Sequence, residues 1–216
     1  MKRASRAAGE IASAISREDM VNLPVRRYEG EVRMVATRED FDEAAADLRS
    51  ERVVGLDTET RPAFTKGESH LPCLVQAATA RAVYLFQLGR AEAYPVLTEL
   101  LEASRIVKAG VALAYDLRSL KLVFPFEEKN VVDLGLVARG AGGSQTGLRN
   151  LAGIFLGFRI PKGNRTSNWA ARQLSPAQIT YAATDAWACR ELFMRFESLG
   201  LLSRAGDSKN RHRSAM

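Results

Sequence analysis

The chain has few of the residues from which a disulfide framework or a zinc site is built. Among its 216 residues there are only two cysteines, Cys73 and Cys189, and two histidines. A structural zinc site usually takes four sulfur or nitrogen ligands, and this sequence has no such cluster. Both cysteines stand among apolar residues, so we expect buried free thiols.

Long apolar runs are also absent. No segment approaches the roughly 18–20 consecutive apolar residues that a membrane-spanning helix needs. The first 20 residues are basic, but they lack the apolar run of a signal peptide and contain Glu10, Glu18 and Asp19. We therefore expect a cytoplasmic protein without a membrane partner.

Acidic residues are outnumbered by basic ones. The chain has 31 Lys and Arg against 25 Asp and Glu, which gives a formal net charge of +6 and an isoelectric point near 9.6. This excess favours an anionic partner such as nucleic acid, although it is also compatible with solubility alone. Hydrophobic residues make up 46% of the chain, which is typical of a globular protein.

The length suits one domain with extensions. We expect a basic N-terminal extension at residues 1–30, a folded domain at residues 31–202 and a basic mobile tail at residues 203–216. Within the extension, the apolar spacing around residues 11–15 indicates a short amphipathic helix. No internal repeat and no second domain is visible.

Predicted strands come first, and helices alternate with the later ones. The segments predicted as strands are residues 25–36, 52–57, 72–79, 82–88 and 105–110, and residues 131–139 should carry a short strand into a helix. Thr37 followed by Asp40, and Ser175 followed by Pro176 and Gln178, are typical of helix starts. The second of these helices should run to about Leu199. This order favours a mixed sheet flanked by helices.

Two carboxylates, Asp57 and Glu59, follow the apolar part of the strand that begins at residue 52. Residues i and i+2 of a strand point to the same face, so these acids project together. Neighbouring carboxylates in a low-dielectric site repel each other, and a hard cation such as Mg²⁺ or Mn²⁺ relieves that repulsion. The alternative is that both acids simply begin a solvated loop.

Two further acids lie downstream. Asp116 falls early in a predicted helix, where the helix dipole alone would also favour it. Tyr181 and Asp185 are four residues apart and share one face of the long C-terminal helix, among small alanines that permit close approach to a sheet. An unpaired charge in such an apolar stretch is costly, so Asp185 needs a partner unless it faces solvent.

Together these pieces resemble the DEDD superfamily of 3′→5′ exonucleases, in the subclass with a tyrosine in its third motif (DEDDy). The matching motifs are Asp57-Thr58-Glu59, the segment from Gly110 to Asp116, and Tyr181 to Asp185. The similarity is to the Werner-type and ribonuclease D branch, and it covers about residues 35–200. It implies an α/β, ribonuclease H-like fold with a mixed five-stranded sheet flanked by helices.

The resemblance also implies a chemistry. The protein would be a metal-dependent 3′→5′ exonuclease that releases nucleoside 5′-monophosphates from the 3′ end of DNA or RNA. Asp57, Glu59, Asp116 and Asp185 would bind two Mg²⁺ or Mn²⁺ ions, and Tyr181 would position the attacking water.

The sequence departs from the family pattern at two places. Thr60 stands where relatives often have Trp, and Ala112 stands where the second motif usually has Gly. Neither change removes a carboxylate, so the departure at Thr60 concerns substrate preference rather than catalysis.

The substrate is expected to be single-stranded or 3′-ended nucleic acid, bound by the basic loop at residues 159–173 and by residues near the first motif. The candidate substrate-binding residues are Thr58, Thr60, Phe64, Lys162, Arg165, Asn168 and Trp169. Two of them have structural alternatives, since Trp169 could be a packed anchor and Phe64 a core residue.

Two other functions are compatible with parts of the sequence. A nucleic-acid-binding module of the same fold could have lost catalysis, but the intact set of four acids and Tyr181 argues against it. A dinucleotide-binding α/β protein is disfavoured because no G-x-G-x-x-G follows the first strand. The choice between DNA and RNA and the oligomeric state stay open.

Overall fold

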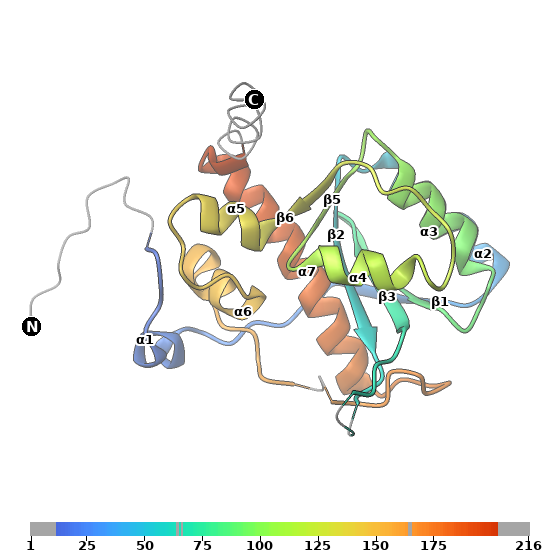
Figure 1. The fold of residues 1–216 in the computed structure, drawn as a ribbon, viewed down its shortest axis with the longest axis horizontal. Coiled ribbons are helices and arrows are strands. Elements are labelled where there is room, and N and C mark those ends of the chain that lie inside the picture. Colours follow the sequence, from blue (N-terminus) through green and yellow to red (C-terminus); the bar gives the residue numbers. More distant parts are fainter. Residues whose placement is uncertain (1–11, 64, 66, 164–165, 203–216) are drawn as a thin grey trace, which may run out of the picture.

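A mixed sheet of six strands forms the centre of the computed structural model, which describes residues 12–63, 65, 67–163 and 166–202 (Figure 1). The strands are β1 (Glu31–Val35), β2 (Val53–Thr60), β3 (Pro72–Ala78), β4 (Ala82–Gln87), β5 (Val107–Gly110) and β6 (Val131–Asp133). The expected α/β, ribonuclease H-like class is confirmed, but the expected count of five strands is wrong. The strand β6 has only three residues, and its parallel pairing with β5 makes it part of the sheet.

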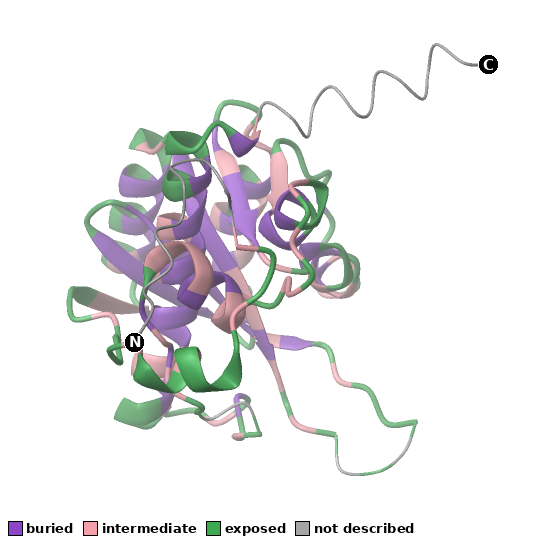
Figure 2. Ribbon diagram, turned by 90° about the vertical axis from the view of Figure 1, so that its left-hand side faces the viewer, coloured by how far each residue is buried: buried purple, intermediate pink, exposed green. Residues whose placement is uncertain are grey.

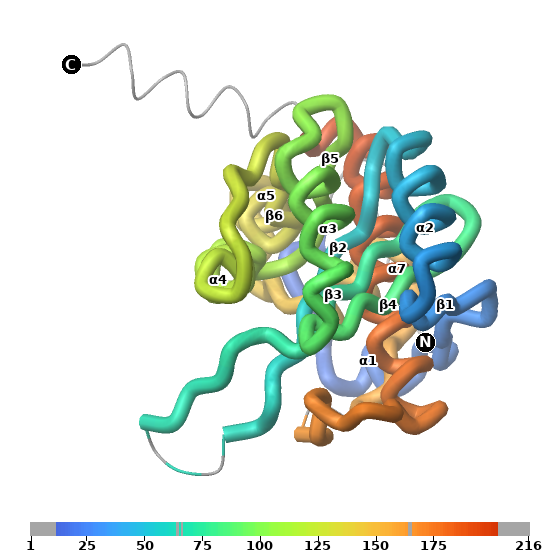
Figure 3. Tube along the Cα trace, turned by 90° about the vertical axis from the view of Figure 1, so that its right-hand side faces the viewer, coloured from blue at the N-terminus to red at the C-terminus, as the bar shows by residue number. Residues whose placement is uncertain are grey.

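The strand order is β1-β4-β3-β2-β5-β6. The strand β3 runs antiparallel to both of its neighbours, β2 and β4, whereas the pairs β1–β4, β2–β5 and β5–β6 are parallel. The central strand β2 therefore belongs to both a parallel and an antiparallel ladder. The described residues that follow β2 and precede β3 extend away from the body of the protein (Figures 2 and 3).

Helices cover both faces of this sheet. They are α1 (Arg17–Asn22), α2 (Arg38–Ser50), α3 (Ala93–Glu102), α4 (Leu113–Leu120), α5 (Leu134–Gly140), α6 (Leu148–Leu151), the π-helical turn η1 (Ala152–Leu156) and α7 (Pro176–Ser198). The helices α2, α3 and α4 pack on one face (Figure 3). The long helix α7 crosses the other face, with α5 and α6 beside it (Figure 1).

The strand β2 is buried between these two layers, as its unbroken apolar run predicted (Figure 2). Val54 and Leu56 belong to the core under α2, α3 and α4, whereas Val53 packs in the core formed with α7. The odd-numbered residues of β2 therefore face α7. This alternation directs the side chains at positions 57 and 59 toward the same helix.

Gly55 allows α7 to approach β2 closely. A Cβ atom at Gly55 would overlap the carbonyl oxygen of Ala186 and would lie 2.7 Å from the backbone nitrogen of Arg190. The helix backbone thus packs directly on the strand backbone. Ala182, Ala183 and Ala186 of α7 are fully buried, and their small side chains let the helix lie close to the sheet.

Both predicted capping boxes are confirmed. The Thr37 amide donates to the Asp40 carboxylate at 2.8 Å, and the Asp40 amide donates back to the Thr37 hydroxyl at 3.2 Å. At the start of α7, Ser175 and Gln178 exchange the same pair of hydrogen bonds at 3.0 and 3.3 Å. These bonds satisfy amides that would otherwise lack partners at the first turn.

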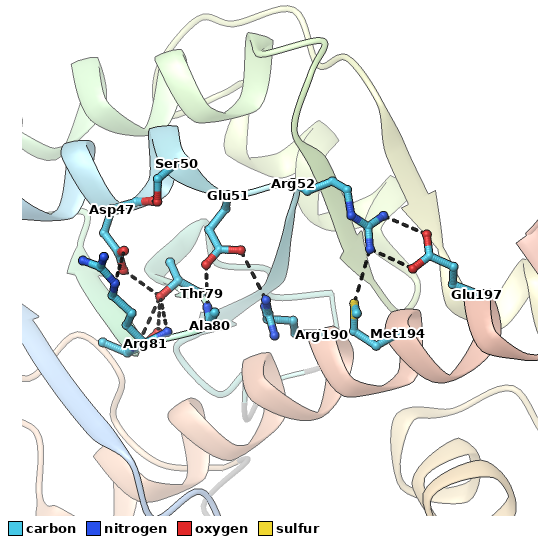
Figure 4. A network of polar contacts seen from close by, with 11 residues as sticks. Asp47, Ser50, Glu51, Arg52, Thr79, Ala80, Arg81, Arg190, Met194 and Glu197 are labelled. Atoms are coloured by element: carbon cyan, nitrogen blue, oxygen red, sulfur yellow. Dashed lines mark hydrogen bonds and ion pairs between the residues drawn. The ribbon is translucent and has the colours of Figure 1, made fainter.

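Ion pairs hold the C-terminal half of α7 over the beginning of β2 (Figure 4). Arg52 donates two hydrogen bonds of 2.7 Å to the carboxylate of Glu197, and Arg190 donates to Glu51 at 3.2 Å. Glu51 also accepts a hydrogen bond of 2.6 Å from the amide of Ala80. Because α7 runs antiparallel to β2, its N-terminal half lies over the end of the strand that carries the acids.

The part of the N-terminal extension that the structure describes, residues 12–30, is called the strap. The expected helix at residues 11–15 is wrong for residues 12–15, and residue 11 lies outside the described residues. The first helix of the described residues is α1, which begins after Ser16, whose hydroxyl accepts from the Asp19 amide. The backbone of Ile15 instead exchanges two hydrogen bonds with the side chain of Gln145. These long-range bonds replace the local ones that a helix would need.

Three further expectations concern the two cysteines, membrane-spanning helices and the C-terminal tail. Both cysteines are free, and Cys189 is buried as expected, whereas Cys73 is only half-buried. Among the described residues, no helix is both long and apolar enough to cross a membrane. The predicted mobile tail at residues 203–216 lies outside the described residues.

Candidate active site

Three carboxylates converge at the end of β2. Asp57 and Glu59 project from the strand toward α7 and meet Asp185, so that one oxygen atom of each side chain lies within 4.8 Å of the other two. Glu59 and Asp185 are buried, and Asp57 is half-buried. The Oδ1 atom of Asp185 is buried and accepts no hydrogen bond from the described residues. Such a set of hard oxygen atoms fits a divalent cation.

The electrostatics of this cluster follow from burial and like charge. Burial raises the pKa of Asp57 well above its usual range, and the charges of Asp185 and Asp116 raise it further. Burial also raises the pKa of Asp185 to about 6, although a hydrogen bond from Tyr181 and the charge of Arg149 oppose this rise. Burial and mutual repulsion of these carboxylates therefore lower the stability of the folded protein, and a bound cation would offset that loss.

Asp116 approaches from the first turn of α4, on the other face of β2. It is not one of the three acids whose oxygen atoms lie within 4.8 Å of one another. Burial raises its pKa to about 6; the Thr58 hydroxyl beside it lowers this value and the charge of Asp133 raises it. The charge of Asp116 raises the pKa of Asp57, so Asp116 interacts with the cluster electrostatically although it lies farther away.

Tyr181 lies one helical turn before Asp185, and its hydroxyl is close enough to lower the pKa of that carboxylate. Burial first, and then the charges of Asp185 and Glu59, raise the pKa of the phenol. The hydroxyl therefore stays protonated at neutral pH and can donate a hydrogen bond. Gly163 packs against the ring, because a Cβ atom there would lie 2.6 Å from the ring carbon Cδ2 of Tyr181.

The comparison with known proteins agrees with this geometry. The family described as 3′-5′ exonuclease matches residues 32–200, which is most of the chain. The chain belongs to the 3′-5′ exonuclease family. It is a 3′-5′ exonuclease domain, as the three motifs predicted.

Relatives of this exonuclease domain are found in bacteria and eukaryotes. Ribonuclease D of Gluconacetobacter diazotrophicus is 34% identical over 164 residues, which cover 74% of this chain and 41% of the relative. A 3′-5′ exonuclease of Arabidopsis thaliana is 29% identical over 197 residues, covering 82% of this chain and 67% of the relative. The chain thus spans about two fifths of the length of that ribonuclease D.

Solved structures show the same fold. The exonuclease domain of Aedes aegypti Nibbler superposes with a TM-score of 0.71 at 24% identity, covering 81% of this chain and 90% of that one. Escherichia coli ribonuclease D gives a TM-score of 0.69 at 22% identity, covering 83% of this chain and 49% of that one.

The candidate substrate-binding residues of this exonuclease fall in different environments. Lys162 and Asn168 are exposed, and Thr58 and Thr60 are half-buried. Thr58 faces Asp116, on the side of β2 opposite to Asp57. Phe64 and Arg165 lie outside the described residues.

Trp169 is fully buried, so the expectation that it borders the substrate is not met in this structure. Its ring centroid lies 5.9 Å from that of Tyr181, and its Nε1 atom is buried without a hydrogen-bond partner among the described residues. Trp169 packs as an anchor, which was the structural alternative. It supports the ring of Tyr181 from within the core formed with α7.

A cavity of about 670 Å³ opens beside the acids of the exonuclease, and the sequence did not reveal all of its residues. Asp185, Tyr181 and Lys162 line it together with Arg149 of α6 and Met20 of α1. Arg149 escaped detection because the apolar spacing around it predicted only a helix. Met20 escaped because no local pattern indicates that the strap packs against the nuclease domain.

Ala112, one of the two departures from the family pattern, stands where the backbone favours glycine. It adopts a left-handed conformation, with φ of 59°, just before α4. A residue with a Cβ atom, such as alanine, is strained in this conformation by about 1 kcal/mol, whereas glycine is not. We expect Ala112→Gly to raise the free energy of unfolding by up to about 1 kcal/mol, because relief of strain exceeds the entropy that glycine adds to the unfolded chain. Urea denaturation measures this, and a lower midpoint for the variant would contradict it.

Proposed function

We propose that this 3′-5′ exonuclease is metal-dependent and uses two Mg²⁺ or Mn²⁺ ions to hydrolyse the terminal phosphodiester bond of a 3′ end, releasing a nucleoside 5′-monophosphate. The observation that carries the proposal is the convergence of Asp57, Glu59 and Asp185, with the buried Oδ1 of Asp185 lacking a partner among the described residues. A buried cluster of like charges without a ligand would only cost stability.

In this proposal the acids bind the metal ions and Tyr181 orients the attacking water. Asp57, Glu59 and Asp185 would hold the ions, and Asp116 would contribute its charge from a greater distance. When bound, the ions lower the pKa of the attacking water and neutralise charge on the leaving 3′ oxygen. Tyr181, whose protonated hydroxyl interacts with the Asp185 carboxylate, would orient that water.

The proposed substrate is nucleic acid with a single-stranded 3′ end. Several relatives are named ribonuclease D, and one solved structure is that of Trypanosoma brucei ribonuclease D in complex with the RNA U12, at a TM-score of 0.67 and 20% identity. That complex shows that the Trypanosoma protein binds RNA, and it does not test which nucleic acid this chain binds. For this chain both RNA and DNA are proposed substrates, to be compared directly.

A single assay tests the proposal. Purified protein is incubated with 5′-labelled single-stranded RNA or DNA, in Mg²⁺, in Mn²⁺ and in EDTA. We expect a ladder with one-nucleotide steps that disappears in EDTA, and a blocked 3′ end should prevent it. Binding without shortening in either metal would refute the proposed catalysis and favour an inactive nucleic-acid-binding module.

The raised pKa values predict how pH affects the metal-free protein. The pKa values of Asp116 and Asp185 are about 6 in the folded state and about 4 in the unfolded state, so the folded protein binds more protons between these values. Stability in EDTA should therefore fall as pH rises from about 4 to about 6, and Mg²⁺ should restore it above pH 6.

Thermal unfolding with EDTA and with Mg²⁺ at several pH values measures this effect. We expect the increase in Tm caused by Mg²⁺ to be several degrees at neutral pH and to shrink toward pH 5. An increase that does not depend on pH would indicate that the metal does not bind these carboxylates.

A further inference from the structure

The strap forms part of the wall beside the catalytic residues, although it lies outside the stretch that matches the exonuclease family. That stretch begins at residue 32. Met20 of the strap lines the cavity next to Asp185. Arg27 of the strap lines a second cavity, of about 470 Å³, which shares Tyr181 and residues 160–163 with the first. The two cavities are therefore neighbours that meet at the catalytic tyrosine.

The chemistry of the second cavity suits a nucleotide unit. Arg27 and Lys162 are its two charged lining residues, and both are exposed. In the part of the chain that the structure describes, neither forms an ion pair. The remaining lining is apolar or carries hydroxyl groups, such as those of Thr180 and Thr184. The side chains of Arg27 and Lys162 can bind a phosphate, while a sugar or base packs against the apolar lining of the same cavity.

The backbone around Arg27 is fixed on both sides. The amide of Arg26 donates to the carbonyl of Arg159 at 3.1 Å, and the amide of Tyr28 donates to the hydroxyl of Thr184 at 3.0 Å. Thr184 immediately precedes the catalytic Asp185 on α7. The strap is thus attached to the same helical turn as the active site, so the ordering of Arg27 costs little extra entropy when a ligand binds.

We propose that Arg27 and Lys162 form a phosphate-binding subsite for the substrate strand, occupied by a backbone phosphate at least one nucleotide away from the scissile bond. The proposal rests on the proposed function, because it takes the substrate to be a nucleic-acid strand. The ligand is the phosphodiester backbone, which RNA and DNA share. A substrate too short to reach the second cavity does not use this subsite.

The test compares Arg27→Gln with Arg26→Gln. Arg26 is the adjacent exposed arginine, and it does not line either cavity. Hydrolysis is measured with a dinucleotide, which has only the scissile phosphate, and with a single strand of about 12 nucleotides. We expect Arg27→Gln to lower kcat/KM on the longer strand about tenfold, as loss of one charge-assisted contact should. The dinucleotide should be hydrolysed as before, and Arg26→Gln should match the unmodified protein on both substrates.

Salt dependence gives a second readout. The slope of log kcat/KM against log salt concentration should become shallower by about 0.7 in Arg27→Gln, the value for one lost phosphate contact on a single strand. Equal behaviour of the two variants on the longer strand would overturn the subsite. Equal loss on both substrates would also overturn it, because it would indicate damage to the catalytic turn.

Binding in EDTA separates this inference from the proposed function. Fluorescence anisotropy with the longer strand requires no hydrolysis, so it reports on the subsite even if the protein cleaves nothing. Weaker binding by Arg27→Gln than by Arg26→Gln would then support the subsite while the proposed catalysis fails. Equal binding by the two variants, together with normal hydrolysis, would leave the proposed function standing and remove the subsite.

Discussion

Replacing Asp185 with asparagine is expected to lower kcat about 10³-fold and, in EDTA at neutral pH, to raise the Tm. The loss of activity follows because the amide removes an anionic ligand from the group formed with Asp57 and Glu59, and metal-based charge stabilisation contributes several kcal/mol. The gain in stability follows because the neutral side chain ends the repulsion that raises the pKa of Asp57. Hydrolysis assays and thermal unfolding measure the two effects on one protein sample.

The opposite signs of these effects make the prediction specific. A purely structural role of Asp185 would lower activity and stability together. Asp42→Asn is the matched control, because Asp42 is an exposed residue of α2 whose only described ion pair is with Arg38 at 3.8 Å. The control should change neither quantity. An Asp185→Asn protein with nearly full activity would remove this residue from the proposed metal site.

Gly55→Ala is expected to have the largest effect of any change outside the acids. The added Cβ would overlap the carbonyl oxygen of Ala186, so α7 must move away from β2. Overpacking of this kind costs about 3 kcal/mol in the free energy of unfolding. Since Asp185 precedes Ala186, the shift should also separate it from Asp57, and a displacement of about 1 Å can lower kcat/KM about 100-fold.

Urea denaturation and the hydrolysis assay measure these two losses. Gly89→Ala is the matched control, because a Cβ atom at Gly89 meets no atom within 4 Å. It should change the free energy of unfolding by no more than about 0.5 kcal/mol. If Gly55→Ala does not fold, circular dichroism will reveal that directly. A folded variant with normal stability would show that α7 does not need this close approach.

The sequence predicted those features that depend on short-range patterns. The two-residue period of a strand placed Asp57 and Glu59 on one face, and the four-residue spacing on a helix placed Tyr181 with Asp185. Both helix starts with capping boxes were also found, because their hydrogen bonds join residues three apart. In each case the sequence contains all the partners within one turn or one strand.

Features that depend on distant contacts were not predictable in this way. The strap binds through residues 130 or more positions away, such as Gln145 for Ile15 and Thr184 for Tyr28. The burial of Trp169 depends on α7. The short strand at residues 131–139 was predicted, but its place as a sixth strand of the sheet depends on β5. The need for glycine at position 55 becomes visible only when the helix that crosses it is in place.

The antiparallel packing of α7 on β2 also determines when this nuclease can become active during its synthesis. Asp57 is made with β2, but Asp185 is made only with α7, and α7 must then close a long loop to dock on the sheet. A ribosome-bound chain that ends before α7 has two of the three clustered acids and lacks Tyr181. The growing polypeptide therefore lacks the complete acid cluster until α7 has been released and has folded.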